Sequence, residues 1–151
     1  MIRNFRESDL KEIETVYEKS NDAVFLNVDP DFFRKDKKNF SSDTIRHCKN
    51  LIFEENGRIL GVVSFSGEYL EGLFVLPEFW NRGIGSALLN SALEGMRELR
   101  LQVYADNSRA VGFYRKHGFR IVRNGVCQMT GLTYFEMEKR SDFNENCMHK
   151  R

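Results

Sequence analysis

Residues 80–86, with the sequence Trp-Asn-Arg-Gly-Ile-Gly-Ser, have a composition suited to binding phosphate. The segment lies between a predicted strand that ends at Pro77 and the start of a predicted long helix. Its glycines, Gly83 and Gly85, allow a tight turn that brings several amide N–H groups together. At a helix N-terminus such amides favour an anion, and Arg82 adds a positive charge. The same glycines would also suit a turn without a ligand, so this segment alone leaves both interpretations open.

Two other phosphate-binding motifs are excluded by the residues that follow. The dinucleotide-binding pattern GxGxxG needs a third glycine for close packing of its helix on a strand, and the sequence has Leu88 there. The P-loop pattern needs Gly-Lys followed by Ser or Thr, which this segment lacks. Neither motif describes the segment.

Residues 107–119 follow a predicted strand and form the second segment that could do chemistry. Asn107 or Ser108 is suited to begin a helix as its N-cap, and Gly118 is suited to end it. Tyr114 lies on the inward stripe of that helix. Taken alone, that position is typical of a core aromatic with its hydroxyl at an edge.

The remaining pattern predicts the elements that position these segments. Asp9, with Glu12 three residues later, indicates a capped helix, and the Asn-Gly pair at 56–57 indicates a hairpin with a type I′ turn. Apolar residues at every fourth position from Ile84 to Met96 predict a helix of about fourteen residues. The order of elements indicates an α/β domain with a mixed sheet. The predicted strands are 2–6, 51–55, 58–65, 69–76, 99–104, 119–127 and 132–138, and the predicted helices begin near Ser8, Pro30, Ile84 and Ser108.

Composition indicates one soluble globular domain. The chain has 151 residues, a formal net charge of +1 from 23 basic and 22 acidic side chains, and 41% apolar residues. A chain of this size buries about two-thirds of its surface on folding, enough for one hydrophobic core. A duplex-binding domain usually has a clear excess of basic residues, so nucleic acid is not an expected partner. We expect one domain at 1–138 and a polar C-terminal tail at 139–151.

Cysteine content and hydropathy bear on metal binding and on location. Cys48, Cys127 and Cys147 form no CxxC pair and have no further ligands at zinc spacing, so we expect free thiols and no metal. The N-terminus lacks the apolar segment of a signal peptide, and no stretch approaches the roughly 20 apolar residues of a membrane span. We therefore expect a cytoplasmic protein that does not bind a membrane.

Three segments of the chain resemble the GNAT family of acyl-CoA-dependent N-acetyltransferases, in its small single-domain bacterial form. They are Leu-Phe-Val-Leu-Pro at 73–77, Arg-Gly-Ile-Gly-Ser-Ala-Leu-Leu at 82–89, and the spaced residues Asn107, Ala110, Phe113, Tyr114, Gly118 and Phe119. The resemblance covers residues 1–138 and implies an α/β (α+β) fold. Its sheet would be mixed and mostly antiparallel, with about seven strands, a splayed parallel pair and about four helices.

One position departs from the family pattern. The family usually has Gln or Arg three residues before the first glycine, and this chain has Trp80. Because the phosphate site works mainly through backbone amides, we expect Trp80 to alter local packing more than binding.

The resemblance implies acetyl-CoA as the co-substrate. Its pyrophosphate would bind the amides of residues 82–86, and its peptide-like pantetheine arm would pair with the strand edge at 73–75. Asn107 would hydrogen-bond the arm, and Tyr114 would stand next to the thioester sulfur. The implied cofactor-binding residues are Leu73, Phe74, Val75, Arg82, Gly83, Ile84, Gly85, Ser86, Asn107 and Ala110.

The implied reaction is direct attack of an amine on the thioester carbonyl, followed by loss of CoA thiolate. A strand amide near 73–75 would stabilise the oxyanion, and Tyr114 would donate a proton to the sulfur. Glu71 is the candidate for the base that deprotonates the amine, usually through water, and Glu68 is the second, although either could be a solvated strand carboxylate. Because only an enzyme needs Tyr114, we favour catalysis over the alternative, a catalytically silent acyl-CoA-binding regulatory module.

The acceptor is an amine of a small molecule or a peptide that the sequence does not identify. Its pocket would come from the region 17–33 and from the closing hairpin near 127–134. The strand 132–138 and the strand before it could offer an edge for a homodimer, although the same alternation suits an ordinary final strand. Candidate pocket residues are Phe25, Phe32, Phe33 and Tyr134, which could also be ordinary core, and Asp22, Asp29 and Asp31, which could also be caps and turns.

Overall fold

The computed structural model describes residues 1–26, 28–29 and 31–140. The chain divides into two compact units, Met1–Glu94 and Gly95–Arg151. Among the described residues, no helix has both the length and the apolar character needed to cross a membrane.

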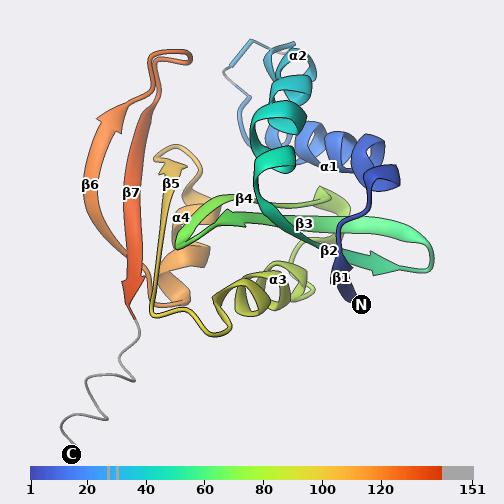
Figure 1. Cartoon of the computed structure of the whole chain (residues 1–151). Coiled ribbons are helices and arrows are strands. Elements are labelled where there is room, and N and C mark those ends of the chain that lie inside the picture. The colour runs from blue at the N-terminus through green and yellow to red at the C-terminus, as the bar shows by residue number, and fades with distance from the viewer. Residues whose placement is uncertain (27, 30, 141–151) are drawn as a thin grey trace, which may run out of the picture. The chain divides into compact units, whose positions relative to one another are not determined.

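The first unit is an antiparallel sheet with helices on both faces (Figure 1). The strands lie in the order β1-β2-β3-β4, and each pairs antiparallel with the next. Figure 1 shows α1 and α2 on one face of this sheet and α3 on the other. The strands are β1 (Ile2–Asn4), β2 (Lys49–Glu55), β3 (Arg58–Ser66) and β4 (Tyr69–Val75), and the helices are α1 (Leu10–Asp22), α2 (Phe32–Asn39) and α3 (Ile84–Leu93).

Strand β3 lies in the middle of this core because both of its faces are covered. Its neighbouring residues Val62 and Val63 point to opposite faces of the sheet and both have 0% exposure. A methyl group placed on Gly61 would meet the side chain of Leu88 of α3 at 3.1 Å. Phe74 of β4 points to the other face, where its ring meets Tyr17 of α1 edge-on at 5.2 Å. The helices therefore shield both faces of the strands that lead to the turn at 80–86.

The second unit contains three strands and one helix in the part of the chain described. Its strand order is β5-β7-β6, with both pairings antiparallel. Leu101 and Met137 are register partners at its centre and are 1% and 0% exposed. The elements are β5 (Glu98–Tyr104), α4 (Ser108–Lys116), β6 (Arg120–Val126) and β7 (Thr133–Arg140).

Most of the predicted elements are confirmed within a few residues. The described residues hold seven strands and four α-helices, as the resemblance implied. At the predicted hairpin, Asn56 has φ +55° and Gly57 has φ +78°, the two positive values that a type I′ turn requires. Strand β7 continues to Arg140, so the first two residues of the predicted tail belong to the strand. The remainder of that tail, with Cys147, lies outside the described residues, as does Pro30.

One expectation about an element end was wrong. The predicted helix of about fourteen residues ends at Leu93, and Met96 lies beyond it, because Glu94 leaves the helical region with ψ 121° and Gly95 then adopts a left-handed φ of +79°. The edge for a homodimer was expected on the strand 132–138 or on the strand before it, and the homodimer stays a prediction. Strand β7 lies between β5 and β6 and pairs with both. Of the two strands considered for a homodimer edge, only β6 has a single partner within the described part of the second unit.

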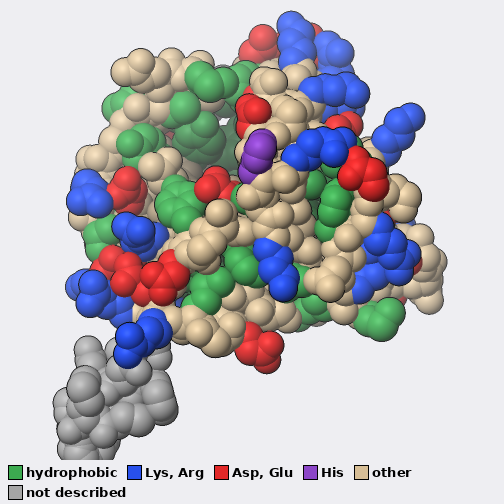
Figure 2. Space-filling model, viewed as in Figure 1, with side chains coloured by type: hydrophobic (Ala, Val, Ile, Leu, Met, Phe, Trp, Pro, Cys, Tyr) green, Lys and Arg blue, Asp and Glu red, His purple; other side chains and the backbone are tan. Residues whose placement is uncertain are grey.

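The charged residues of α2 form a solvent-facing surface. Figure 2 shows Lys and Arg side chains gathered over this helix. Arg34 pairs with Asp31 at 3.2 Å, and both side chains are more than half exposed. Lys37 pairs with Glu18 of α1 at 3.0 Å.

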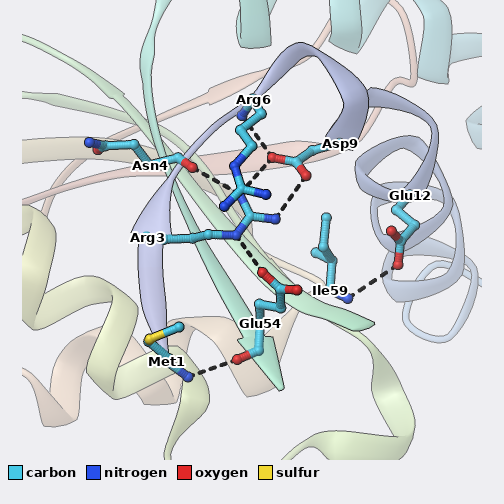
Figure 3. A network of polar contacts seen from close by, with 8 residues as sticks. All are labelled: Met1, Arg3, Asn4, Arg6, Asp9, Glu12, Glu54 and Ile59. Carbon is cyan, nitrogen blue, oxygen red and sulfur yellow. Dashed lines mark hydrogen bonds and ion pairs between the residues drawn. The ribbon is translucent and has the colours of Figure 1, made fainter. Parts of the chain in front are cut away.

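The start of α1 is held by a network of ionic contacts in place of the predicted capping box (Figure 3). Asp9 accepts hydrogen bonds from the Arg6 backbone N–H at 2.7 Å and from the Arg3 guanidinium at 2.8 and 2.9 Å. Arg3 also pairs with Glu54 of β2. Glu12, the predicted partner of Asp9, accepts instead from the Ile59 backbone N–H of β3 at 3.2 Å. The network therefore joins β1, β2 and α1, which a local sequence pattern does not describe.

Replacing Arg3 by Met is expected to lower the free energy of unfolding by about 2–4 kcal/mol, because two partly buried carboxylates lose their cation. Urea unfolding followed by circular dichroism measures the change. The matched control is Arg34→Met, which removes an exposed pair and should cost less than about 1 kcal/mol.

The same network predicts a pH dependence. The hydrogen bonds from Arg3 hold the pKa of Asp9 below its ordinary value of 3.8. The Arg3 contribution should therefore be complete at neutral pH and should fall as pH drops through that lowered pKa. Equal losses of stability in the Arg3 and Arg34 variants at pH 7 would contradict this account.

Candidate functional site

The turn between β4 and α3 has the geometry of an anion site. Gly83 is the N-cap residue of α3 and has a left-handed φ of +83°, and Asn81 before it has φ +67°. A methyl group on Gly83 would meet no atom within 4 Å, so the backbone conformation, rather than space within the protein, favours glycine here. Gly85 differs from the expectation, because it is already part of α3 and has no positive φ. The turn itself therefore depends on Gly83 alone of the two glycines.

The N-terminus of α3 directs backbone amides and a positive dipole end toward this turn. The first helical hydrogen bond of α3 runs from the Ala87 N–H to the carbonyl of the N-cap residue Gly83 at 3.0 Å. Ile84 and Gly85, whose amides precede this bond, are the first two residues of the ten-residue helix. Such amides and the helix dipole favour a negatively charged group.

An aromatic ring holds two cations beside the same turn. The guanidinium of Arg82 lies 5.1 Å from the centre of the Phe79 ring, and that of Arg58 lies 5.2 Å from it. Glu78 pairs with Arg58 at 3.5 Å. The side chain of Arg82 therefore keeps its charge close to the start of α3.

Trp80 occupies part of the edge of β4 that faces away from β3. The Leu76 N–H donates to the Leu60 carbonyl of β3 at 2.9 Å. Because the C=O and N–H of a trans peptide point in opposite directions, the Val75 carbonyl points away from β3. The indole Nε1 of Trp80 donates to that carbonyl at 2.8 Å. The sequence did not indicate this bond. It joins Trp80, the residue that departs from the family pattern, to the end of β4.

Strand β4 contains a bulge at Glu71. Ser64 of β3 is the partner of Gly72, and Phe65 is the partner of Leu70, so Glu71 is the extra residue. A bulge redirects the side chain at its extra residue. Glu71 is exposed, yet partial burial raises the pKa of its carboxyl above 4.5. Burial, and next the charge of Glu71, raises the pKa of the Cys48 thiol.

The aromatic residues considered for an acceptor pocket form a packed cluster of the first unit. Phe25 and Phe33 are 8% and 4% exposed, and their rings lie 5.5 Å apart. Phe32 meets Phe33 edge-on at 4.9 Å. The interpretation as ordinary core therefore describes Phe25 and Phe33. Tyr134, the fourth candidate, is half-buried on β7 of the second unit.

The three acidic residues considered for attracting an amine have different surroundings. Asp29 accepts from the Asp31 N–H at 3.0 Å, and Asp31 pairs with Arg34. These two are turn and surface residues. Burial, with the charge of Glu18, raises the pKa of Asp22 at the end of α1.

In the second unit, α4 positions the other predicted site residues. Of the two expected N-cap residues, Asn107 is the one found, and its Oδ1 accepts from the Ala110 N–H at 3.0 Å. Tyr114 is 6% exposed and packs against the rings of Phe113 and Phe119 at 5.3 and 5.5 Å. This burial raises the pKa of the Tyr114 phenol, which therefore keeps its proton across neutral pH.

The loop between β6 and β7 contains a polarised thiol that sequence reasoning missed. Burial opposes ionisation of Cys127, but hydrogen bonds from Thr130 and Tyr104 lower the pKa of its thiol to about 7. The Tyr104 hydroxyl lies 3.4 Å from Sγ. Cys48 and Cys127 are both free thiols, and the described residues contain no group of three metal-ligating side chains.

Comparison with known proteins identifies the family. The model of the acetyltransferase (GNAT) family matches residues 10–119. The peptidyl-lysine N-acetyltransferase YiaC of Escherichia coli is 39% identical over 79 residues, a match that spans about half of each protein, 52% of this chain and 54% of the relative. The peptidyl-lysine N-acetyltransferase YjaB of E. coli is 27% identical over 138 residues, covering 88% of this chain and 90% of the relative.

Solved structures confirm the predicted fold class. The apo form of E. coli YjaB has a TM-score of 0.80 at 23% identity and covers 91% of this chain and 95% of its own. The PaiA N-acetyltransferase of Thermoplasma acidophilum, solved with coenzyme A, has a TM-score of 0.75 at 21% identity and covers 93% of this chain and 98% of its own. Because the family model matches well over half of the residues of this chain, the chain belongs to the GNAT acetyltransferase family.

Proposed function

We propose that this protein is an N-acetyltransferase that uses acetyl-CoA to acetylate lysine side chains of a peptide or protein. The observation that carries the proposal is the turn at the start of α3, where Gly83, the helix amides and Arg82 form an anion site. The lysine acceptor is supported by the names of the E. coli relatives YiaC and YjaB. Acetyl-CoA would supply an acetyl group activated as a thioester.

Residues of the first unit would bind the phosphates and the arm of acetyl-CoA. The amides of residues 82–86, with the Arg82 guanidinium, would hold the pyrophosphate. The edge of β4 at Leu73–Val75 would bind the pantetheine arm as an added strand. An amide of the same strand would stabilise the oxyanion that forms when the amine attacks.

Two residues of α4, one of them its N-cap, would have the remaining roles that the resemblance implies. Asn107 would hydrogen-bond the pantetheine arm, next to Ala110. Tyr114 would donate its phenol proton to the departing sulfur. Its raised pKa keeps that proton in place at neutral pH.

Glu71 would accept a proton from the acceptor amine through water. A lysine amine has an ordinary pKa near 10.4, so it is mostly protonated at pH 7 and needs a base. The bulge of β4 singles out this side chain, and its raised pKa makes the carboxylate a stronger base than an ordinary glutamate.

The proposal is tested with a panel of amines. Peptides with one internal lysine, in free and N-terminally acetylated forms, are incubated with acetyl-CoA, and thiol release and peptide mass are measured. Acetylation of the lysine in both forms is the expected result. Acetylation only at the free N-terminus would show that the acceptor is an N-terminal amine and not a lysine side chain. CoA binding without turnover on any amine would favour the silent regulatory module.

Replacing Glu71 by Gln is expected to lower kcat by about 10²-fold, because the amine loses its base. In the unmodified enzyme, activity should fall as pH drops through the raised pKa of Glu71, above 4.5, since the carboxylate is the active form. The variant should lose this acid limb. The comparison variant is Glu68→Gln, in the turn before β4, which should keep near-normal rates; the reverse result would assign the base to Glu68.

A further inference from the structure

Trp80 is the only tryptophan of the chain, and it attaches the phosphate-binding turn to the end of β4. Its indole N–H donates to the Val75 carbonyl at 2.8 Å. Its own backbone N–H donates to the Pro77 carbonyl at 3.1 Å, so the intervening residues form a closed turn. The side chain is half-buried, and it stands two residues before Arg82.

The Val75 carbonyl, which accepts from the Trp80 indole, lies on the edge of β4 that faces away from β3. An added strand binds through both the N–H and the C=O groups of such an edge. With the Val75 carbonyl already accepting from the indole, an arm paired at this edge would meet fewer open acceptors at the end nearest the turn. The indole thus makes the hydrogen bond to Val75 that an added strand would otherwise make. The same bond fixes where the turn begins.

We propose that Trp80 is a positioning residue for acetyl-CoA, acting through its hydrogen bond to Val75. The bond sets the start of the turn relative to β4, so that the phosphate-binding amides meet the pyrophosphate while the strand edge meets the adjoining pantetheine arm. This inference rests on the proposed use of acetyl-CoA. It also revises the expectation that Trp80 affects packing more than binding.

The first test separates the hydrogen bond from the ring. Trp80→Phe keeps an aromatic side chain and removes the donor, and it should raise both the KM for acetyl-CoA and the Kd for CoA by about three- to tenfold, the net value of one hydrogen bond. The value of kcat should remain within about twofold, because Trp80 touches no reacting atom. Trp80→Gln, which restores a side-chain N–H donor, should recover most of the lost affinity.

The opposite pattern would overturn the inference. A lower melting temperature with unchanged KM and Kd in Trp80→Phe would show that the indole serves packing only. Equal affinity in the Phe and Gln variants, at equal stability, would show that the donor is not what matters.

A second measurement needs no activity. The single indole N–H gives one indole signal in a ¹⁵N-labelled sample, and its hydrogen exchange can be followed without CoA. Slow exchange is expected, because the N–H is held by Val75, and exchange as fast as that of free tryptophan would contradict the bond. A protected indole in a protein that binds no CoA would contradict the proposed function, whereas an unprotected indole with normal CoA binding would contradict this inference alone.

Discussion

Replacing Tyr114 by Phe is expected to lower kcat by about 10²- to 10⁴-fold, the usual contribution of a positioned general acid. The phenylalanine keeps the ring that packs against Phe113 and Phe119, and it removes only the hydroxyl. The free energy of unfolding should therefore change by about 1 kcal/mol or less. CoA affinity should be nearly intact, because the hydroxyl acts on the leaving sulfur.

The measurement compares kcat, CoA affinity and melting temperature with those of a packing control. Phe113→Leu disturbs the same aromatic contacts and leaves the hydroxyl of Tyr114 in place, so it should lower the melting temperature more than kcat. If Tyr114→Phe instead lowers the melting temperature with near-normal turnover, the residue is structural. Full activity of the variant would remove the catalytic role of Tyr114 without removing the acetyltransferase function, since water can also protonate the thiolate.

Replacing Gly83 by Val is expected to weaken CoA binding by several kcal/mol, about 10²-fold or more. The left-handed φ of +83° at Gly83 is unfavourable for a β-branched residue, so the turn must change its path. A methyl group on Gly83 would meet no protein atom within 4 Å, so the loss would come from the backbone and from the proposed phosphates and not from a clash within the protein. Calorimetry with CoA measures the loss.

Gly95→Val is the matched control for the cost of the backbone. Gly95 follows α3, has φ +79°, and a methyl group on it would also meet nothing within 4 Å. Both variants should lose similar stability, and only the Gly83 variant should lose CoA affinity. The helical Gly85, changed to Val, should block the phosphates without backbone strain. If Gly83→Val and Gly85→Val both bind CoA as the unmodified protein does, the phosphate site has been placed incorrectly.

Features that depend on neighbouring residues were predictable. The type I′ turn at 56–57 and the end of α4 at Gly118 each need a left-handed φ, and the residues at those positions are the ones that tolerate it. The N-cap role of Asn107 follows from a side-chain oxygen within reach of an amide three residues later. The order of strands and helices follows from the periods of the apolar residues, which are also local.

Features that depend on strand register or on distant partners were not predictable. The bulge that singles out Glu71 arises from how β4 pairs with β3, and the sequence of either strand alone does not show it. Asp9 was expected to cap α1 with Glu12, but its carboxylate instead accepts hydrogen bonds from the Arg3 guanidinium and the Arg6 backbone N–H. An arginine held by two carboxylates, one of them 51 residues away, outweighs a local capping pattern.

The sequence by itself therefore determined the elements, the two motifs and the family, because backbone conformation and apolar period are encoded within a few residues. Only the tertiary structure decided which groups within those motifs are engaged. It assigned the turn to Gly83 rather than to both glycines, joined Trp80 to the Val75 carbonyl, and buried Tyr114 so that the pKa of its phenol rises. These properties depend on packing and on strand pairing, which bring together residues whose contacts no local pattern records.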